Sequence, residues 1–233
     1  MSADTAVSTA PAGRPSTRRG RGGPPLPIPA VAYGGLTVAA GLTYPGPLPT
    51  ADAAGALATL QAHPVAAQVS AVLLIGASAP LAVWTAAATQ RLQALGARVA
   101  GPVIGLVGGV LAAMSLLLSG LVAWTAAGAA PLGDAPLVRA LSTLAFALGG
   151  TGFAVTSALL LAGVAIPGLI LRLMPRWLAI AGLVVAAAGV LSLVSLLVPA
   201  LSVLLPVARF GGVVWLVAAG VVLPVSRRPR HAD

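Results

Sequence analysis

Six long apolar stretches, separated by short segments rich in proline, glycine and arginine, dominate the pattern of hydrophobic and polar positions along the chain. Each stretch is close to or above the roughly 20 residues that an α-helix needs to cross a bilayer core about 30 Å thick. The pattern therefore predicts an all-α fold, a polytopic transmembrane helical bundle of six spans. The predicted spans lie near residues 27–44, 65–89, 100–127, 138–168, 177–198 and 207–225.

The two ends of the chain have a different composition from this apolar region. Residues 1–25 consist of small and polar residues with Pro and four arginines, and they cannot bury enough apolar surface to offset chain entropy. We therefore predict a disordered basic cytoplasmic tail at 1–25, a six-helix transmembrane domain at 26–226, and a second basic cytoplasmic tail at 227–233.

The distribution of arginine predicts which ends of the spans face the cytoplasm. Short cytoplasmic loops are richer in Lys and Arg than external ones. With both termini cytoplasmic, all of the 13 basic residues except Arg139 and Arg209 fall on the cytoplasmic side of the six-span arrangement. An odd number of spans would break this alternation, so the sequence predicts six spans and a multi-pass membrane protein.

Composition narrows the classes of function. The chain is 58% hydrophobic and 7% charged, which nearly excludes a water-soluble fold. The net charge of +9 comes from arginines in short clusters between apolar segments, so we expect no nucleic-acid partner. Expected partners are membrane lipids, another membrane protein or a second copy of this chain.

Residues that hold metals and cofactors are scarce. The chain has no cysteine, no glutamate and two histidines, which removes cysteine-ligated metal sites and the HExxH metalloprotease pattern. We therefore expect no metal site, no cofactor and no catalytic residues.

Small residues at helical spacing predict where helices approach each other closely, because lipid provides no hydrophobic drive between helices. Gly101, Gly105 and Gly109 recur every four residues and form one stripe on the third predicted span. Gly149 and Gly150 begin two further stripes on the fourth. These five glycines are predicted to serve helix packing.

The segment Gly149–Gly152 also has a functional interpretation. Transporters place broken helices at the membrane midplane, where freed backbone groups bind substrates or ions. The sequence places every Asp, Arg and His at a predicted helix end or in a loop, so we expect no charged side chain beside this segment.

Five polar residues remain as a candidate ligand site on the external face: Asp52, His63, Asp134, Arg139 and Arg209. The two arginines stand there against the positive-inside preference, so each is expected to pair with an acid or to contact phosphate. Pairing between charged loops is one interpretation. A second is a small anion or a lipid headgroup held between the two arginines. A third is that the two side chains extend to the membrane surface without a fixed partner.

The longest external connection, residues 45–64, predicts a short helix on the outer surface. Thr50 or Asp52 offers an amino-terminal cap before Ala53–Gln61, and His63–Pro64 ends the segment.

Several motifs between the helices resemble those of a family of uncharacterised actinobacterial six-helix membrane proteins, a domain of unknown function. The most specific are Pro175-Arg-Trp-Leu178 and Arg209-Phe-Gly-Gly212, with the segments at 91–102, 137–153 and 205–216 around them. The resemblance covers most of residues 27–225. It implies six helices in a bacterial plasma membrane and brings no activity, cofactor or catalytic residue.

Three functions are compatible with these patterns. The leading hypothesis is a non-enzymatic accessory or envelope protein, because the sequence shows extensive packing signals and no catalytic constellation. An alternative is a small-solute or lipid transporter built around Gly149–Gly152. A second alternative is an embedded enzyme acting on a lipid headgroup, which requires Asp52, His63 and Asp134 to converge.

Overall fold

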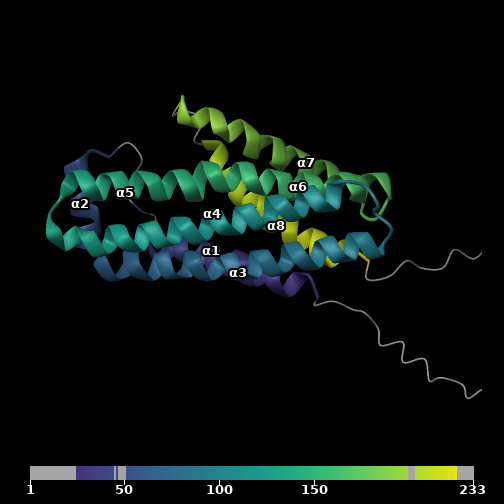
Figure 1. The fold of residues 1–233 in the computed structure, drawn as a ribbon, viewed down its shortest axis with the longest axis horizontal. Helices are drawn as coiled ribbons and strands as arrows, with labels where there is room; N and C mark the ends of the chain where they lie inside the picture. The colour runs from purple at the N-terminus through teal and green to yellow at the C-terminus, as the bar shows by residue number, and fades with distance from the viewer. Residues whose placement is uncertain (1–24, 45, 47–50, 199–202, 225–233) are drawn as a thin grey trace, which may run out of the picture.

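The computed structural model describes residues 25–44, 46, 51–198 and 203–224, and the regular elements in these residues are helical (Figure 1). The predicted tails at 1–25 and 227–233 lie outside the described residues, except for Pro25. The α-helices are α1 (Pro27–Thr43), α2 (Ala53–Ala62), α3 (Pro64–Ala94), α4 (Gly101–Ala129), α5 (Ala135–Ala147), α6 (Phe153–Ile170), α7 (Arg176–Leu191) and α8 (Leu204–Val222). Three short elements join them: η1 (Ala130–Leu132), η2 (Leu148–Gly152) and η3 (Ser192–Leu196).

Five of the helical segments are long and apolar enough to cross a membrane: 64–94, 101–132, 135–170, 176–196 and 204–222. The segment 135–170 is continuous, because η2 is a π-helical turn that joins α5 to α6 without a break. α1 is equally apolar but has 17 residues. By helix length and hydropathy the protein is therefore a multi-pass helical membrane protein.

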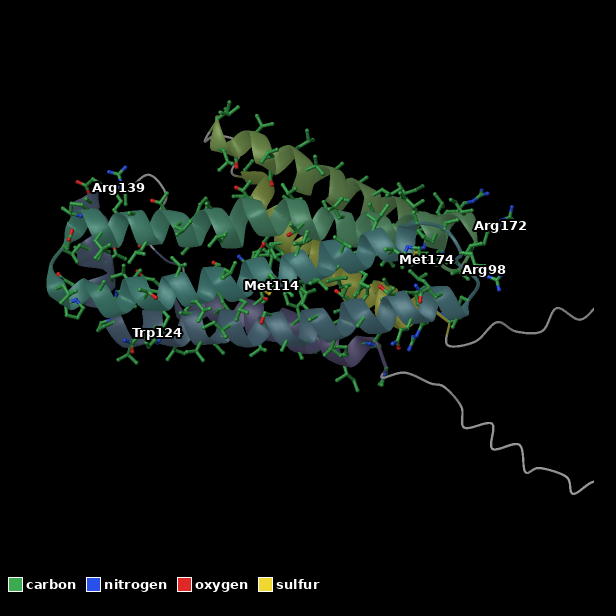
Figure 2. All side chains as sticks on the ribbon, in the orientation of Figure 1. Arg98, Met114, Trp124, Arg139, Arg172 and Met174 are labelled. Carbon is green, nitrogen blue, oxygen red and sulfur yellow. The ribbon has the colours of Figure 1, made fainter. Side chains whose placement is uncertain are left out.

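The helices pack as a closed ring around a common interior. α3 contacts α1 and α4, α4 contacts α6, α6 contacts α7, α7 contacts α8, and α8 contacts α1. Gly220 of α8 lies against Leu26, so α1 begins where α8 ends. Figure 2 shows Arg98 and Arg172 at this end, which we call the Leu26 end, and Arg139 at the opposite end, where α2 lies.

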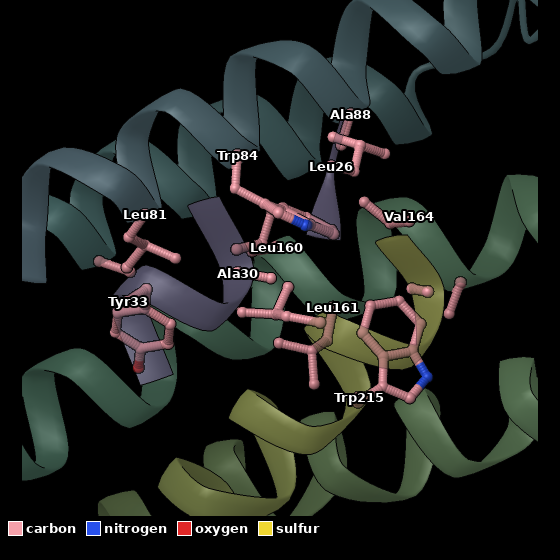
Figure 3. Packing of buried hydrophobic residues seen from close by; sticks show 14 of the residues in the cluster. Leu26, Ala30, Tyr33, Leu81, Trp84, Ala88, Leu160, Leu161, Val164 and Trp215 are labelled. Carbon is pink, nitrogen blue, oxygen red and sulfur yellow. The ribbon is translucent and has the colours of Figure 1, made fainter. Parts of the chain in front are cut away.

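The Leu26 half of the bundle has a densely packed interior. Trp84, Leu81 and Tyr33 are completely or almost completely buried, and Trp215 lies near Leu161 in the same cluster (Figure 3). A tryptophan near the end of a predicted span, as Trp84 is, is typical of the membrane interface, but Trp84 is completely buried in this cluster. The ring of Trp215 lies against Gly182, where a side chain would collide with it.

The glycines of α4 face two different neighbouring helices. Gly101 faces Pro167 and Gly105 faces Gly163, both on α6, whereas Gly109 faces Thr85 on α3. A Cβ at Gly163 would overlap the backbone of Gly105, so α4 and α6 touch through main chain. Such close approach is how membrane helices maximise van der Waals contact without a hydrophobic drive.

At the α2 end, α8 does not reach as far as α3, α4 and α5 and leaves a recess, which we call the shoulder. α8 begins beside η2, where Leu205 lies 3.6 Å from the position of a Cβ on Gly150. α5 continues beyond this level for 13 residues, and α3 and α4 accompany it. α2 packs against α5 and η1 at this end. Of the two predicted caps, Thr50 and Asp52, the cap is Asp52, whose carboxylate accepts a 2.8 Å hydrogen bond from the backbone N–H of Gly55.

The backbone contact between α4 and α6 predicts a large effect of one methyl group. Gly163→Ala should lower the free energy of unfolding by about 1–3 kcal/mol, because two backbones would have to separate. Gly212→Ala is the matched control, since this buried helical glycine has open space around its Cβ position. Thermal unfolding in neutral detergent measures both, and equal midpoints for the two variants would contradict the packing described.

Candidate functional site

A cavity of about 420 Å³ lies at the shoulder, between the α2 end and the packed interior. Its walls come from α3, α4 and α5, and its floor comes from the first turns of α8. Leu60 of α2 and Tyr44, which follows α1, border it toward the α2 end. Most lining side chains are apolar, and Arg209 is the one charged residue among them in the described part of the chain.

Arg209 lies inside the bundle, in the second turn of α8. The sequence predicts no charged side chain beside Gly149–Gly152, and this is wrong, because the guanidinium of Arg209 bonds to the carbonyl of Gly149. α8 begins three residues earlier than the span predicted from 207, and α3, α4 and α5 continue beyond that beginning. Arg209 is therefore surrounded by helices although it is close to the start of its own.

The guanidinium of Arg209 has few partners for a charged group. Its Nη1 donates a long hydrogen bond of 3.5 Å to the carbonyl of Gly149, and its Cζ lies 5.5 Å from the centroid of the Phe153 ring. Nε and Nη2 are shielded from water and have no hydrogen-bond partner among the described residues. A guanidinium carries five N–H donors, so most of this donor capacity is unused.

The π-helical turn η2 provides the carbonyl that Arg209 contacts. Leu148–Gly152 contains three glycines, and a Cβ at Gly149 would collide with the Ser119 hydroxyl of α4. That hydroxyl donates a 2.8 Å hydrogen bond to the carbonyl of Ala145, three residues before the turn. One carbonyl of α5 and one of η2 are therefore bonded by side chains of other helices beside the cavity. Single π turns of this kind are frequent at functional sites.

No carboxylate in the described chain neutralises Arg209. Asp52 and Asp134 are the caps of α2 and α5, and each accepts a hydrogen bond from the backbone of its own helix, at 2.8 Å and 3.0 Å respectively. His63 and Arg139 are exposed. None of these four residues lines the cavity, so the structure does not bring the five predicted ligand-site residues together.

The predicted pairing of charged loops is likewise absent from the described residues, because Arg139 forms no ion pair with Asp134 or Asp52 there. An enzyme built on Asp52, His63 and Asp134 has no support in this geometry. The two carboxylates serve as caps, and the cavity lining contains no carboxylate, imidazole or thiol among the described residues.

Uncharged polar groups complete the cavity wall. The hydroxyl of Tyr44 is buried without a hydrogen-bond partner in the described chain. Ser70 donates to the carbonyls of Ala40 and Tyr44, at 2.9 Å and 3.2 Å. Ser142 of α5 lines the cavity with a half-buried side chain. The hydroxyls of Ser70 and Ser119 already donate to carbonyls, so the hydroxyls of Tyr44 and Ser142 are the ones in this lining that can still donate to a ligand.

Sequence reasoning missed Tyr44, Ser142 and Phe153 as parts of this site. Tyr44, at the end of the first predicted span, has the position typical of an interfacial aromatic residue. One signal in the sequence did point to the site, because Arg209 stands against the positive-inside preference at one end of a span. Whether the Arg209 side chain lies inside the bundle or at its end depends on where α8 begins relative to α5. The apolar stretches of the sequence define such helix ends only to within several residues.

Comparison of the chain with protein families, curated proteins and solved structures finds no match. Membership of the actinobacterial family suggested by the motifs at 175–178 and 209–212 stays a prediction.

The poorly compensated charge of Arg209 predicts that its removal stabilises the protein. Arg209→Met should raise the free energy of unfolding by about 1 kcal/mol, because an unsatisfied buried group costs roughly 1–3 kcal/mol and the lost contact with Phe153 offsets part of the gain. Thermal unfolding in neutral detergent without added anions measures the change. A clear loss of stability would instead show that Arg209 holds the fold together.

Proposed function

We propose that the protein is a non-enzymatic integral membrane protein that binds an anionic ligand in the cavity beside Arg209. We further propose that α1 is a sixth span and that both ends of the chain are cytoplasmic, which makes the α2 end external. The observation that carries this proposal is the buried guanidinium with two unpartnered nitrogens at a cavity whose described lining contains no acid.

Electrostatics supports an anion as the ligand. An ionisable side chain inside a membrane-spanning bundle is expensive and is retained where it has a functional partner. Arg209 has one long bond to a carbonyl and one ring contact, neither of which supplies a negative charge. A carboxylate, sulfate or phosphate oxygen in the cavity would supply it, and a modest rotation of the long arginine side chain would bring more of its donors into contact.

The lining supports binding rather than chemistry. General acid–base and nucleophilic catalysis need a titratable or activated side chain within hydrogen-bonding reach of the reacting atom. The described lining offers serine and tyrosine hydroxyls with no adjacent base. An accessory or receptor-like role, in which occupancy of the cavity is the functional state, fits these residues best.

Transport is the second candidate, and the π turn favours it, because irregular backbone beside a cavity is typical of transporter binding sites. The packed interior argues for binding alone, since Tyr33, Leu81 and Trp84 fill the bundle between the cavity and the Leu26 end. Transport would require this half to open. Anion flux into vesicles reconstituted with the protein, abolished by Arg209→Met, would favour the transporter over the accessory protein.

Anion binding at Arg209 should be visible as stabilisation. Purified protein in a neutral detergent is titrated with inorganic phosphate, sulfate, acetate and octanoate, and its unfolding midpoint is recorded. At a concentration about 100 times the dissociation constant, a bound anion should raise the midpoint by on the order of 5–10 °C. Arg209→Met should show no response to the same anion.

Arg139→Met is the matched control, because Arg139 is an exposed arginine outside the cavity, and this variant should respond as the wild type does. If none of the four anions, and no longer-chain anion, stabilises the wild type in a manner that depends on Arg209, the proposed function is wrong.

The proposed sidedness is tested by single-cysteine labelling, which the cysteine-free chain allows without a background. Arg139→Cys and Arg172→Cys place exposed thiols at opposite ends of the bundle. A membrane-impermeant maleimide should label Arg139→Cys in intact cells. It should label Arg172→Cys only after the cells have been permeabilised. The reverse pattern would invert the orientation, and labelling of both in intact cells would refute it.

A further inference from the structure

We infer that the anion bound at Arg209 is the head of a membrane lipid, a singly charged acyl lipid that reaches the cavity sideways from the bilayer between α5 and the beginning of α8. This inference rests on the proposed function, because it identifies the class of ligand that occupies the same cavity.

The exposure of the lining residues shows where the cavity opens. Phe146 of α5 and Phe210 of α8 line it and are 37% and 47% exposed, and Pro206 is exposed beside them. Residues on the opposite wall, such as Ala71 and Ser119, are buried. The opening is therefore flanked by two aromatic side chains on α5 and α8.

Helix packing keeps this side open. α5 packs against α4 and α2, whereas α8 packs against α1, α6 and α7, and neither set of main partners includes the other helix. The outer faces next to the opening are apolar, with exposed Leu144 on α5 and Val207 on α8. Within a membrane these faces contact lipid tails, so the opening leads into the hydrocarbon layer rather than into water.

The charge of the site limits the head of the ligand. One guanidinium neutralises one negative charge, and the described lining adds a few hydroxyls and no second cation. A small free anion such as phosphate would lose its hydration shell in exchange for very few donors, which is unfavourable. A monoanionic head attached to an acyl chain loses less, because its chain stays in an apolar environment throughout.

The walls of the cavity suit such a chain. Gly150, Leu205 and Phe146 lie close together in the lining and offer apolar contact and no charge. The head would lie beside the guanidinium and the π turn, and the chain would leave between the two phenylalanines. A long-chain carboxylate is the simplest lipid with these properties.

Binding of radiolabelled oleate to the full chain in phosphatidylcholine nanodiscs tests the inference. We expect saturable binding of about one oleate per protein. The competing probes are oleyl alcohol, which keeps the chain without the charge, and acetate and inorganic phosphate, which keep a charge without the chain. Oleyl alcohol should bind about tenfold or more weakly, as expected for the loss of a charge-assisted hydrogen bond, and the short anions should not displace oleate.

Substitutions in the cavity test whether oleate binds there. Arg209→Met and Ser142→Trp, the second of which fills the cavity from α5, should each weaken oleate binding about tenfold or more. Arg139→Met and Thr143→Trp are the matched controls, since both residues are exposed and lie outside the cavity, and they should bind as the wild type does. Tryptic peptide patterns and unfolding midpoints identify any variant that fails to fold.

A photoreactive fatty acid with a diazirine in mid-chain locates the path directly. Crosslinks should map to residues 142–153 and 205–210. If acetate or phosphate occupies the site as tightly as oleate, the lipid inference is overturned and the proposed anion site stands. If oleate binds but crosslinks map elsewhere, access between α5 and α8 is refuted. If no anion binds in a manner that depends on Arg209, the proposed function itself fails.

Discussion

The charge of Arg209 is the constraint around which the half of this bundle near α2 is organised. A guanidinium among apolar helices needs either a counter-charge or several hydrogen bonds, and the described chain gives it one long bond to Gly149 and a contact with the Phe153 ring. The surrounding elements accommodate the charge without neutralising it. The π turn presents a carbonyl, α5 extends past the charge, and the cavity leaves room beside it.

The two halves of the bundle perform different tasks. In the Leu26 half, close backbone contact between Gly105 and Gly163 and the buried rings of Trp84 and Trp215 make a dense interior. The half near α2 extends beyond the first residue of α8, and the cavity lies next to the first turns of this helix. A site of this kind needs a rigid base, because the position of Arg209 is fixed by the helix that carries it.

Much of the fold could be predicted from the sequence, since long apolar stretches have few alternatives in lipid. The all-helical class, the multi-pass character and the Asp52 cap follow from hydropathy and capping rules. Six spans and cytoplasmic termini stay predictions, because the structure identifies five candidate spans and leaves sidedness open. The candidate site was only partly predicted. Arg209 and the segment Gly149–Gly152 were predicted from the charge pattern and the glycines, but Tyr44, Ser142 and Phe153 were not.

The reasons for these failures are geometrical. Whether Arg209 faces loops or the interior depends on where α8 begins relative to α5, and apolar composition alone defines helix ends poorly. The hydrogen bond from Ser119 to Ala145 and the π turn depend on how α4 and α5 face each other. The predicted grouping of Asp52, His63 and Asp134 with the arginines treated all external loops as one surface, whereas the two aspartates are used by their own helices.

The choice of arginine as the single cation of the cavity has a consequence for proton coupling. A guanidinium keeps its proton throughout the physiological range, and the described lining contains no histidine or carboxyl group that could titrate beside it. Acidification or alkalinisation of either compartment would therefore leave the charge of the site constant. Whatever sensitivity to acidity the occupied state has must originate in the ionisation of its occupant.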